Sequence, residues 1–150
     1  MKLENKVAIV TGAASGIGKA IAILFAQEGA QVVASDINLE GIDSSAGMIV
    51  KTDVSLQSEV DNLIDETVKK YGTVDILVNN AGIMDNFMPI GEVTDELWDK
   101  VLAVNSTGLM RTIRKVMPIF LEKKKGVIVN IASIGGLMGS RAGAAYTVSK

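Results

Sequence analysis

Residues 7–18 read VAIVTGAASGIG, an uncharged apolar run that leads directly into glycines at positions 12, 16 and 18. A continuous β-branched run such as residues 7–11 is typical of a strand buried on both faces of a parallel sheet. From Ile17 onward apolar side chains recur at helical spacing, and Gly29 supplies a stop signal. The segment therefore predicts a strand, a tight glycine turn and a helix.

Four more apolar runs of strand length follow, at residues 31–35, 48–52, 74–78 and 127–131. Strands that alternate with helical patterns predict right-handed crossovers and a parallel sheet covered by helices on both faces. We therefore predict one doubly wound, three-layer α/β domain over residues 1–150.

The intervening segments carry helix signals. Ser55 is a candidate N-cap for a helix that ends at Gly72, and Thr94 caps a longer helix with acidic residues in its first turn. Pro118 is expected to kink this helix or to end its regular part. A new helix is predicted from about Ala144.

Composition narrows the possible functions. The chain has 150 residues, a formal net charge of −2, and neither histidine nor cysteine. Interspersed charges give no support for nucleic-acid binding. Without histidine or cysteine, disulfides, thiolate chemistry and the commonest metal ligand are excluded, and no metal site is expected. The polar N-terminus and strand-sized apolar runs predict a cytoplasmic protein with no membrane association.

Ligands of doubly wound sheets bind at the carboxyl ends of the strands. The glycine turn after the first strand has the spacing G-x-x-x-G-x-G over Gly12, Gly16 and Gly18. Such a turn lets the backbone approach a pyrophosphate, and the helix N-terminus then offers free N–H groups to the anion. A turn that simply needs glycine is the alternative. A kinase or P-loop NTPase is excluded, because no Lys-Ser/Thr pair follows the last glycine.

The second and third strands each end at an aspartate. Asp36 is placed to accept hydrogen bonds from the adenosine ribose and to repel a 2′-phosphate, which favours NAD over NADP, although a capping or surface role is the alternative. Asp53, followed by Val54, either contacts the adenine amino group or caps the next helix. Asn79-Asn80-Ala81-Gly82 after the fourth strand leaves room for a cofactor, or forms an ordinary Asn-rich turn.

The candidate residues for acid–base chemistry lie mainly in the last part of the chain. Tyr146 and Lys150 lie one helical turn apart, and Ser133 closes the fifth strand. A tyrosine hydroxyl ordinarily titrates near about pH 10, and a neighbouring ammonium favours its ionised form. Asn105, in the middle of the long helix, is either a buried structural hydrogen-bonder or a site residue. Chance placement of the Tyr–Lys pair on a helix surface is the alternative to a proton-transfer site.

Together these motifs resemble the short-chain dehydrogenase/reductase family, over nearly the whole chain. The resemblance implies a Rossmann fold and a catalytic set of Asn105, Ser133, Tyr146 and Lys150. Tyr146 would be the general acid/base, Ser133 would orient the substrate, Lys150 would bind the nicotinamide ribose, and Asn105 would anchor a water. The implied cofactor-binding residues are Gly12, Ser15, Gly16, Ile17, Gly18, Asp36, Asp53, Val54, Asn80, Ala81, Gly82, Tyr146 and Lys150.

The expected function is hydride transfer between NAD(H) and a secondary alcohol or ketone. The substrate would be a 3-oxoacyl thioester, a diketone such as diacetyl, a sugar or a steroid-like alcohol, with residues 84–89 and 135–143 lining its pocket. The resemblance also implies a homodimer or homotetramer. The alternative from another class is a non-catalytic regulatory or scaffolding protein that binds nucleotide on the same fold.

Two departures from the family pattern are expected to matter. Asp36 and Asp53 are only 17 residues apart, so the helix between strands two and three should be abbreviated and the adenine side of the site thin. Family members also continue past the Tyr–Lys pair with further strands and a substrate-covering segment. We therefore expect residues 1–150 to be part of a longer chain, with apolar surface exposed at the open edge of the sheet.

Overall fold

A computed structural model describes residues 1–138 and 142–150. All of the paired strands are parallel and form one five-stranded sheet in the order β3-β2-β1-β4-β5. The strands are β1 (Val7–Thr11), β2 (Gln31–Asp36), β3 (Met48–Lys51), β4 (Ile76–Asn79) and β5 (Val127–Asn130). The strand order reverses between β1 and β4, which confirms the predicted doubly wound, Rossmann-like fold and places its ligand-binding crevice at the carboxyl ends of these two strands.

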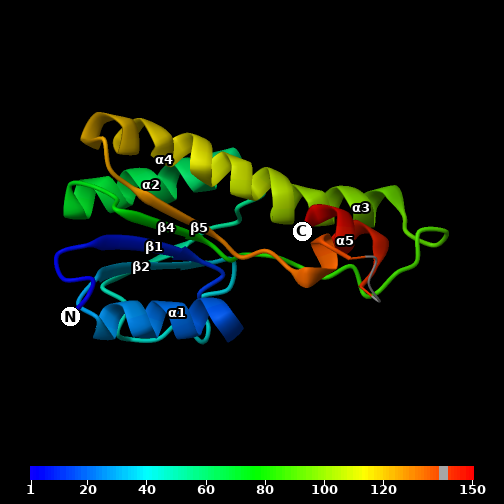
Figure 1. Cartoon of the computed structure of the whole chain (residues 1–150), viewed down its shortest axis with the longest axis horizontal. Coiled ribbons are helices and arrows are strands. Elements are labelled where there is room, and N and C mark those ends of the chain that lie inside the picture. Colours follow the sequence, from blue (N-terminus) through cyan, green and yellow to red (C-terminus); the bar gives the residue numbers. More distant parts are fainter. Residues whose placement is uncertain (139–141) are drawn as a thin grey trace.

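Helices cover both faces of the sheet (Figure 1). Helix α1 (Gly16–Gln27) lies on one face, and α2 (Gln57–Tyr71) and α4 (Leu109–Lys123) lie on the other. Helix α3 (Asp95–Leu102) and the C-terminal α5 (Ala144–Ser149) lie together beyond one end of the sheet. Short turns η1 (Ala103–Gly108) and η2 (Ile134–Gly136) complete the set. The abbreviated helix expected between the second and third strands is absent, since residues 37–47 contain no helix.

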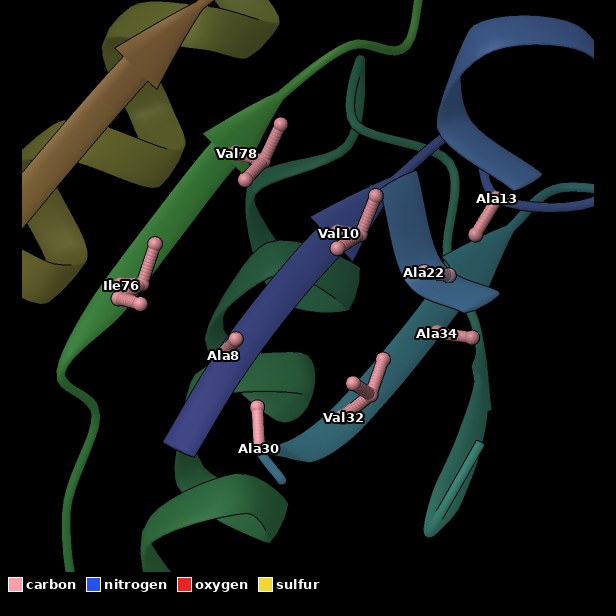
Figure 2. Packing of buried hydrophobic residues seen from close by; sticks show 9 residues of the cluster. All are labelled: Ala8, Val10, Ala13, Ala22, Ala30, Val32, Ala34, Ile76 and Val78. Carbon is pink, nitrogen blue, oxygen red and sulfur yellow. The ribbon is translucent and has the colours of Figure 1, made fainter. Parts of the chain in front are cut away.

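Alternate residues of β1 pack on opposite faces, because successive side chains of a strand point to opposite sides. Ala8 and Val10 face α1, in a cluster rich in alanine that lets the helix lie close to the sheet (Figure 2). Ile9 faces α2 and α4, where larger side chains including Leu63 and Phe120 fill the space. All three β1 residues are fully buried, which explains why the strand is apolar throughout.

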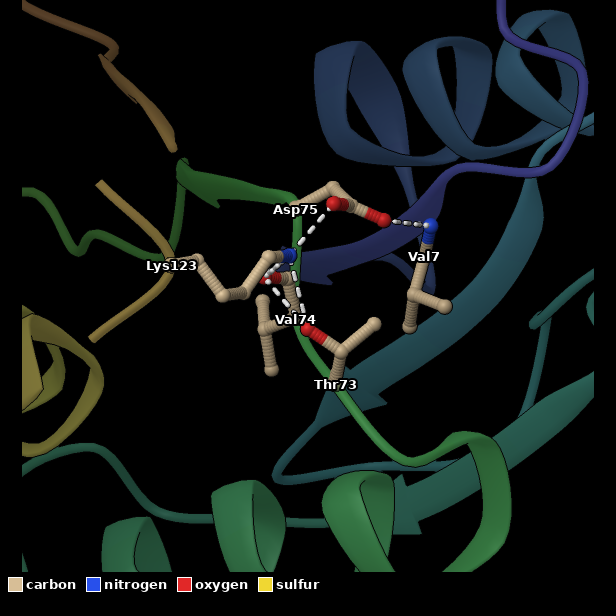
Figure 3. A network of polar contacts seen from close by, with 5 residues as sticks. All are labelled: Val7, Thr73, Val74, Asp75 and Lys123. Carbon is tan, nitrogen blue, oxygen red and sulfur yellow. Dashed lines mark hydrogen bonds and ion pairs between the residues drawn. The ribbon is translucent and has the colours of Figure 1, made fainter. Parts of the chain in front are cut away.

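Asp75 organises the end of the sheet opposite to the predicted site (Figure 3). Its carboxylate accepts a hydrogen bond from the backbone N–H of Val7 at 2.9 Å and forms an ion pair with Lys123 at 2.5 Å. The Lys123 ammonium also donates to the carbonyl of Val74 and the hydroxyl of Thr73. This network ties the start of β1 and the end of α4 to the segment that leads into β4.

The structure corrects several details of the helices. Helix α2 has Leu56 as its N-cap, so Ser55, the predicted cap, lies one residue too early. Pro118 neither ends nor divides α4, which continues to Lys123. The interruption of the long helix lies instead at η1, a π-helical turn. Strand β1 has the predicted bounds, and the other four strands differ from prediction by one or two residues at an end. Thr94 caps α3 as predicted, through a bond from the N–H of Leu97.

Strand β5 forms one edge of the sheet, and its Val127 and Val129 side chains are exposed. Apolar surface at this edge is therefore present, as expected. Within residues 1–138 and 142–150, no helix is long and apolar enough to span a bilayer.

Candidate active site

The glycine turn lies against the end of β4. Gly12 and Gly16 have φ of 66° and 53°, a left-handed conformation that glycine adopts without strain. A Cβ at Gly12 would lie 2.8 Å from Nδ2 of Asn80, and one at Gly18 would overlap the carbonyl oxygen of Gly12. The predicted turn therefore requires glycine at Gly12 for both conformation and space, and at Gly18 for close packing of helix on loop.

Side chains fasten this turn to β4. The Nδ2 of Asn80 donates to the carbonyl oxygens of Thr11 and Gly12, both at 3.0 Å. The hydroxyl of Thr11 accepts from the N–H groups of Asn80 and Ala81, both at 3.1 Å, and donates to Val78. These bonds hold the carboxyl ends of β1 and β4 together, where the strand order reverses. The sequence did not single out Thr11, although its position at the last residue of β1 was a usable signal.

A cavity of about 720 Å³ opens beside this junction. That volume falls within the range of sites for small molecules and cofactors. The residues that line it are Gly12, Ser15, Gly16, Ile17, Asp36, Ile37, Thr52, Asp53, Val54, Ser55, Asn80, Ala81, Gly82, Ile83, Lys100, Ala103 and Val104. All of the predicted cofactor-binding residues except Gly18, Tyr146 and Lys150 are therefore gathered around one cavity.

The two aspartates of the cavity also make local bonds. One carboxylate oxygen of Asp36 accepts from the N–H of Ala14 at 3.0 Å and the other from Asn38 at 3.1 Å, which couples the acid to the glycine turn. Asp53 accepts from the N–H of Ser55 at 2.8 Å. This bond is local to the turn before α2, and the N-cap of that helix is Leu56, so Asp53 does not cap it. Each carboxylate oxygen retains a lone pair with which it can accept another hydrogen bond.

Asn105 is the centre of a second cluster. The residue is 4% exposed, and its amide bonds both the N–H and the carbonyl of Ile83, at 2.8 and 3.0 Å. The same amide donates to the hydroxyl of Ser149 at 2.8 Å. Asn105 lies within the π-helical turn η1, so the widened turn coincides with the residue that links β4's exit loop to α5. Both alternatives for Asn105 remain compatible with this geometry, since it is structural and lies beside the predicted catalytic pair.

Lys150 reaches back toward the same cluster. Its ammonium donates to the carbonyl of Ile131 at 3.1 Å and lies 6.0 Å from the centre of the Tyr146 ring. A Cβ at Gly82 would lie 3.1 Å from this ammonium and 3.3 Å from Oδ1 of Asn105. Burial lowers the pKa of Lys150 from its ordinary value, because desolvation penalises the charged form. Gly82, Asn105 and Lys150 therefore converge at the rim of the cavity.

Ser133 lies at the exit of β5. It precedes η2, a turn that contacts α5, and its hydroxyl accepts from the N–H of Gly135 at 3.1 Å. The fold thus brings Ser133 and Tyr146 onto two adjacent elements. The described members of the two predicted substrate-lining segments, residues 84–89, 135–138 and 142–143, lie outside the 720 Å³ cavity. Residues 139–141 of the second segment lie outside the described part of the chain.

Asp85 was missed by the sequence reasoning. Its side chain is fully buried, and its carboxylate accepts from the backbone N–H of Tyr146 at 2.9 Å. A buried acid in an irregular loop gives no periodic signal, because its burial depends on a helix far away in sequence. Within residues 1–138 and 142–150, no group of three or more acidic side chains forms a metal site.

A parallel sheet whose order reverses at a glycine turn, with a cofactor-sized cavity beside it, defines the Rossmann class of nucleotide-binding domains. Comparison with known proteins gives the family. Residues 6–150 match the short chain dehydrogenase family, and the chain belongs to it.

Individual relatives agree with this assignment. The chain is 41% identical to 3beta-hydroxysteroid dehydrogenase 2 of Eggerthella lenta, across 99% of the chain and 61% of the relative. It is 40% identical to the 3-oxoacyl-(acyl-carrier-protein) reductase FabG of Thermotoga maritima, across 100% and 64%. A solved structure, the crystal structure of gox2181, superimposes with a TM-score of 0.89 at 35% identity, covering 99% of this chain and 62% of that one. The chain therefore spans about three fifths of the length of these relatives.

Proposed function

We propose that the protein carrying this chain is an NAD-dependent oxidoreductase that interconverts a secondary alcohol and a ketone. The observation that carries the proposal is the convergence of Gly82, Asn105 and Lys150 at the rim of a cavity already lined by the glycine turn and Asp36. Family membership supports the same conclusion, because the family implies a nicotinamide cofactor. The nicotinamide, when bound, carries the hydride, and the protein supplies position and charge.

The volume and the lining residues of the cavity support binding of the cofactor. Glycine at positions 12 and 18 lets α1 and the glycine turn pack against the end of β4, and the N-terminus of α1 offers free N–H groups to a pyrophosphate. Asp36 lines the cavity with oxygens that can accept from two ribose hydroxyls. A 2′-phosphate would place negative charge against this carboxylate, which supports a preference for NAD over NADP.

The residues that transfer the proton and orient the substrate lie on α5 and at the exit of β5. The Tyr146 hydroxyl donates its proton to the substrate oxygen during ketone reduction and takes it back during alcohol oxidation. The Lys150 ammonium favours the ionised phenol and can bind the nicotinamide ribose, and the Ser133 hydroxyl orients the substrate oxygen. Asn105 fixes the exit loop of β4 to α5 through its bonds to Ile83 and Ser149, and thereby holds both sides of the site in register.

The substrate is a ketone or a secondary alcohol, within the classes of 3-oxoacyl thioesters, diketones, sugars and steroid-like alcohols. The names of two relatives, a 3beta-hydroxysteroid dehydrogenase and a 3-oxoacyl reductase, support the first and the last of these classes.

The proposed assembly is a homodimer or homotetramer formed through the long helix and α5. The apolar side chains of Met110 on α4 and Val148 on α5 are 43% and 63% exposed, which supports burial of these faces in an interface. Sedimentation of the full-length protein tests this assembly, and a monomer at micromolar concentration would contradict it.

The decisive experiment measures cofactor binding and turnover together in the full-length protein. Calorimetry with NADH and NADPH should show tighter binding of NADH. A panel of the four ketone classes should then yield one that is reduced, and Tyr146→Phe should lower kcat about 10²–10⁴-fold. Binding of NADH with equal, negligible turnover in both proteins would indicate a non-catalytic binding module instead. No binding of either nucleotide would refute the proposal.

A further inference from the structure

Residues 83–88 follow the exit of β4 and contact α5, the helix that carries Tyr146. Asn105 bonds both backbone polar groups of Ile83, and Asp85 comes two residues later. The carboxylate of Asp85 accepts from the N–H of Tyr146 at 2.9 Å, and the carbonyl of Met88 accepts from the N–H of Ala144 at 3.0 Å. The first turn of α5 therefore has two of its otherwise unpaired N–H groups bonded to residues 85–88.

The burial of Asp85 is costly unless its charge is compensated. Its side chain is 0% exposed, and an ionised carboxylate out of water needs hydrogen-bond donors. The described donors are the N–H groups of Tyr146 and, at 3.2 Å, Phe87. Hydrogen bonds to a charged acceptor are roughly twice as strong as neutral ones. The bond to Tyr146 is therefore among the stronger constraints on the position of that residue.

The backbone of the loop is strained at Phe87, and the Asp85 contacts explain this strain. Asn86 and Phe87 have φ of 57° and 60°; asparagine adopts this conformation readily, whereas for phenylalanine it costs roughly 1–2 kcal/mol. Burial of Phe87 does not offset this cost, because its side chain is 66% exposed. The left-handed turn instead brings the N–H of Phe87 to the carboxylate and the carbonyl of Met88 to α5.

Gly143 provides independent evidence that the carboxylate is closely fitted. The glycine has an ordinary φ of −67°, so its backbone would accept alanine without strain. A Cβ at this position would nevertheless overlap both carboxylate oxygens of Asp85. Because Gly143 has no side chain, the Asp85 carboxylate can lie against the start of α5.

We infer that Asp85 is a positioning residue, whose buried carboxylate fixes the backbone of Tyr146 so that the phenol meets the substrate oxygen. The inference rests on the proposed function, in which Tyr146 transfers the proton. Asp85 does not touch the reacting atoms, and its effect acts through the placement of α5. A displacement of about 1 Å in a reacting group can cost about 10²-fold in rate.

The test uses the full-length protein and its Asp85→Asn variant, with Asp75→Asn as the matched control. Asp75 is another acid whose carboxylate accepts a backbone N–H, but it is only partly buried and lies at the opposite end of the sheet. We expect Asp85→Asn to lower kcat about tenfold to hundredfold, to leave the NADH dissociation constant and KM within about threefold, and to speed amide exchange at Tyr146. Asp75→Asn should lower thermal stability but keep kcat within about twofold.

Gly143→Ala keeps the test decisive if Asp85→Asn folds poorly, because it retains the carboxylate but displaces it. Gly143→Ala alone should lower kcat at least about tenfold, whereas in an Asp85→Ala background it should add less than about twofold. Additive losses in this cycle, or a wild-type kcat in Asp85→Asn while Tyr146→Phe is inactive, would overturn the inference. An inactive wild type that binds no NADH would instead refute the proposed function, and with it the role of Asp85.

Discussion

Substitution of Gly18 by alanine tests the packing of α1 on the glycine turn. A Cβ at Gly18 would overlap the carbonyl oxygen of Gly12 and approach Nδ2 of Asn80, the group that bonds this same carbonyl. The residue lies inside a helix, so intrinsic propensity alone would favour alanine by about 1 kcal/mol. Overpacking against rigid backbone costs typically about 1–3 kcal/mol, with loop movement as the relief.

The two effects predict a net loss of up to about 2 kcal/mol in the free energy of unfolding, with the Gly12 turn displaced. Because this turn lines the cavity, NADH affinity should fall about tenfold or more, equivalent to about 1.4 kcal/mol of binding free energy. Denaturant unfolding and calorimetric titration of the full-length protein measure the two quantities separately.

Gly72→Ala is the matched control. Gly72 ends α2 with φ of 78°, has no other atom within 4 Å of the position that a Cβ would occupy, and does not line the cavity. Alanine there should cost about 1–2 kcal/mol of stability through backbone strain alone and leave NADH affinity unchanged. If Gly18→Ala were more stable than wild type and bound NADH equally well, the proposed close contact between α1 and the glycine turn would be refuted.

Three further predictions concern stability and specificity. The pKa of Asp75 lies below its ordinary value: burial raises it, but the bonds from Lys123 and the N–H of Val7 lower it by more. A carboxyl whose pKa is lowered in the native state stabilises the folded protein at pH values above its unfolded pKa of about 3.9. Asp75→Asn should therefore lower the free energy of unfolding by about 1 kcal/mol at pH 7, and the difference from wild type should shrink as the pH falls below about 4. The buried hydroxyl of Thr52 has no hydrogen-bond partner within the described residues, so Thr52→Val should raise the unfolding free energy by about 1 kcal/mol in urea titrations; a loss of stability would contradict this. Asp36→Ser should lower the ratio of the NADPH dissociation constant to the NADH dissociation constant at least about tenfold in calorimetry. An unchanged ratio of these constants would exclude Asp36 as the group that selects NADH.

The sheet and most of its helices were predictable because their signals are local. The run at residues 7–11 and the glycines at 12, 16 and 18 predicted β1, its turn and α1 from adjacent residues alone. The cavity-lining acids Asp36 and Asp53 followed from one rule, that parallel strands present their carboxyl ends at a common edge. Ser133 precedes η2 and Tyr146 lies on α5, and these two elements are in contact.

Features that depend on distant contacts were not predictable in this way. Asp85 reads as one polar residue of a loop, and its burial arises only when α5, 61 residues later, places Tyr146 against it. The π-helical turn at Asn105 also escaped prediction, because residues 103–108 have no composition that separates a π turn from an α turn. Pro118 was given too much weight, since α4 accommodates it and continues to Lys123.

The π-helical turn constrains how the length of the long helix can change. A π turn contains about one residue more than an α turn, and each α-helical residue advances the helix by about 100°. Residues before η1 contact α5, whereas residues after it contact α2 and β4. Deletion of one residue between 103 and 108 would rotate α4 against the sheet and turn Val116 and Phe120 out of the core. Insertions and deletions should therefore be confined to the loops at the two ends of this helix, whereas a substitution on its outer face leaves the orientation of Val116 and Phe120 unchanged.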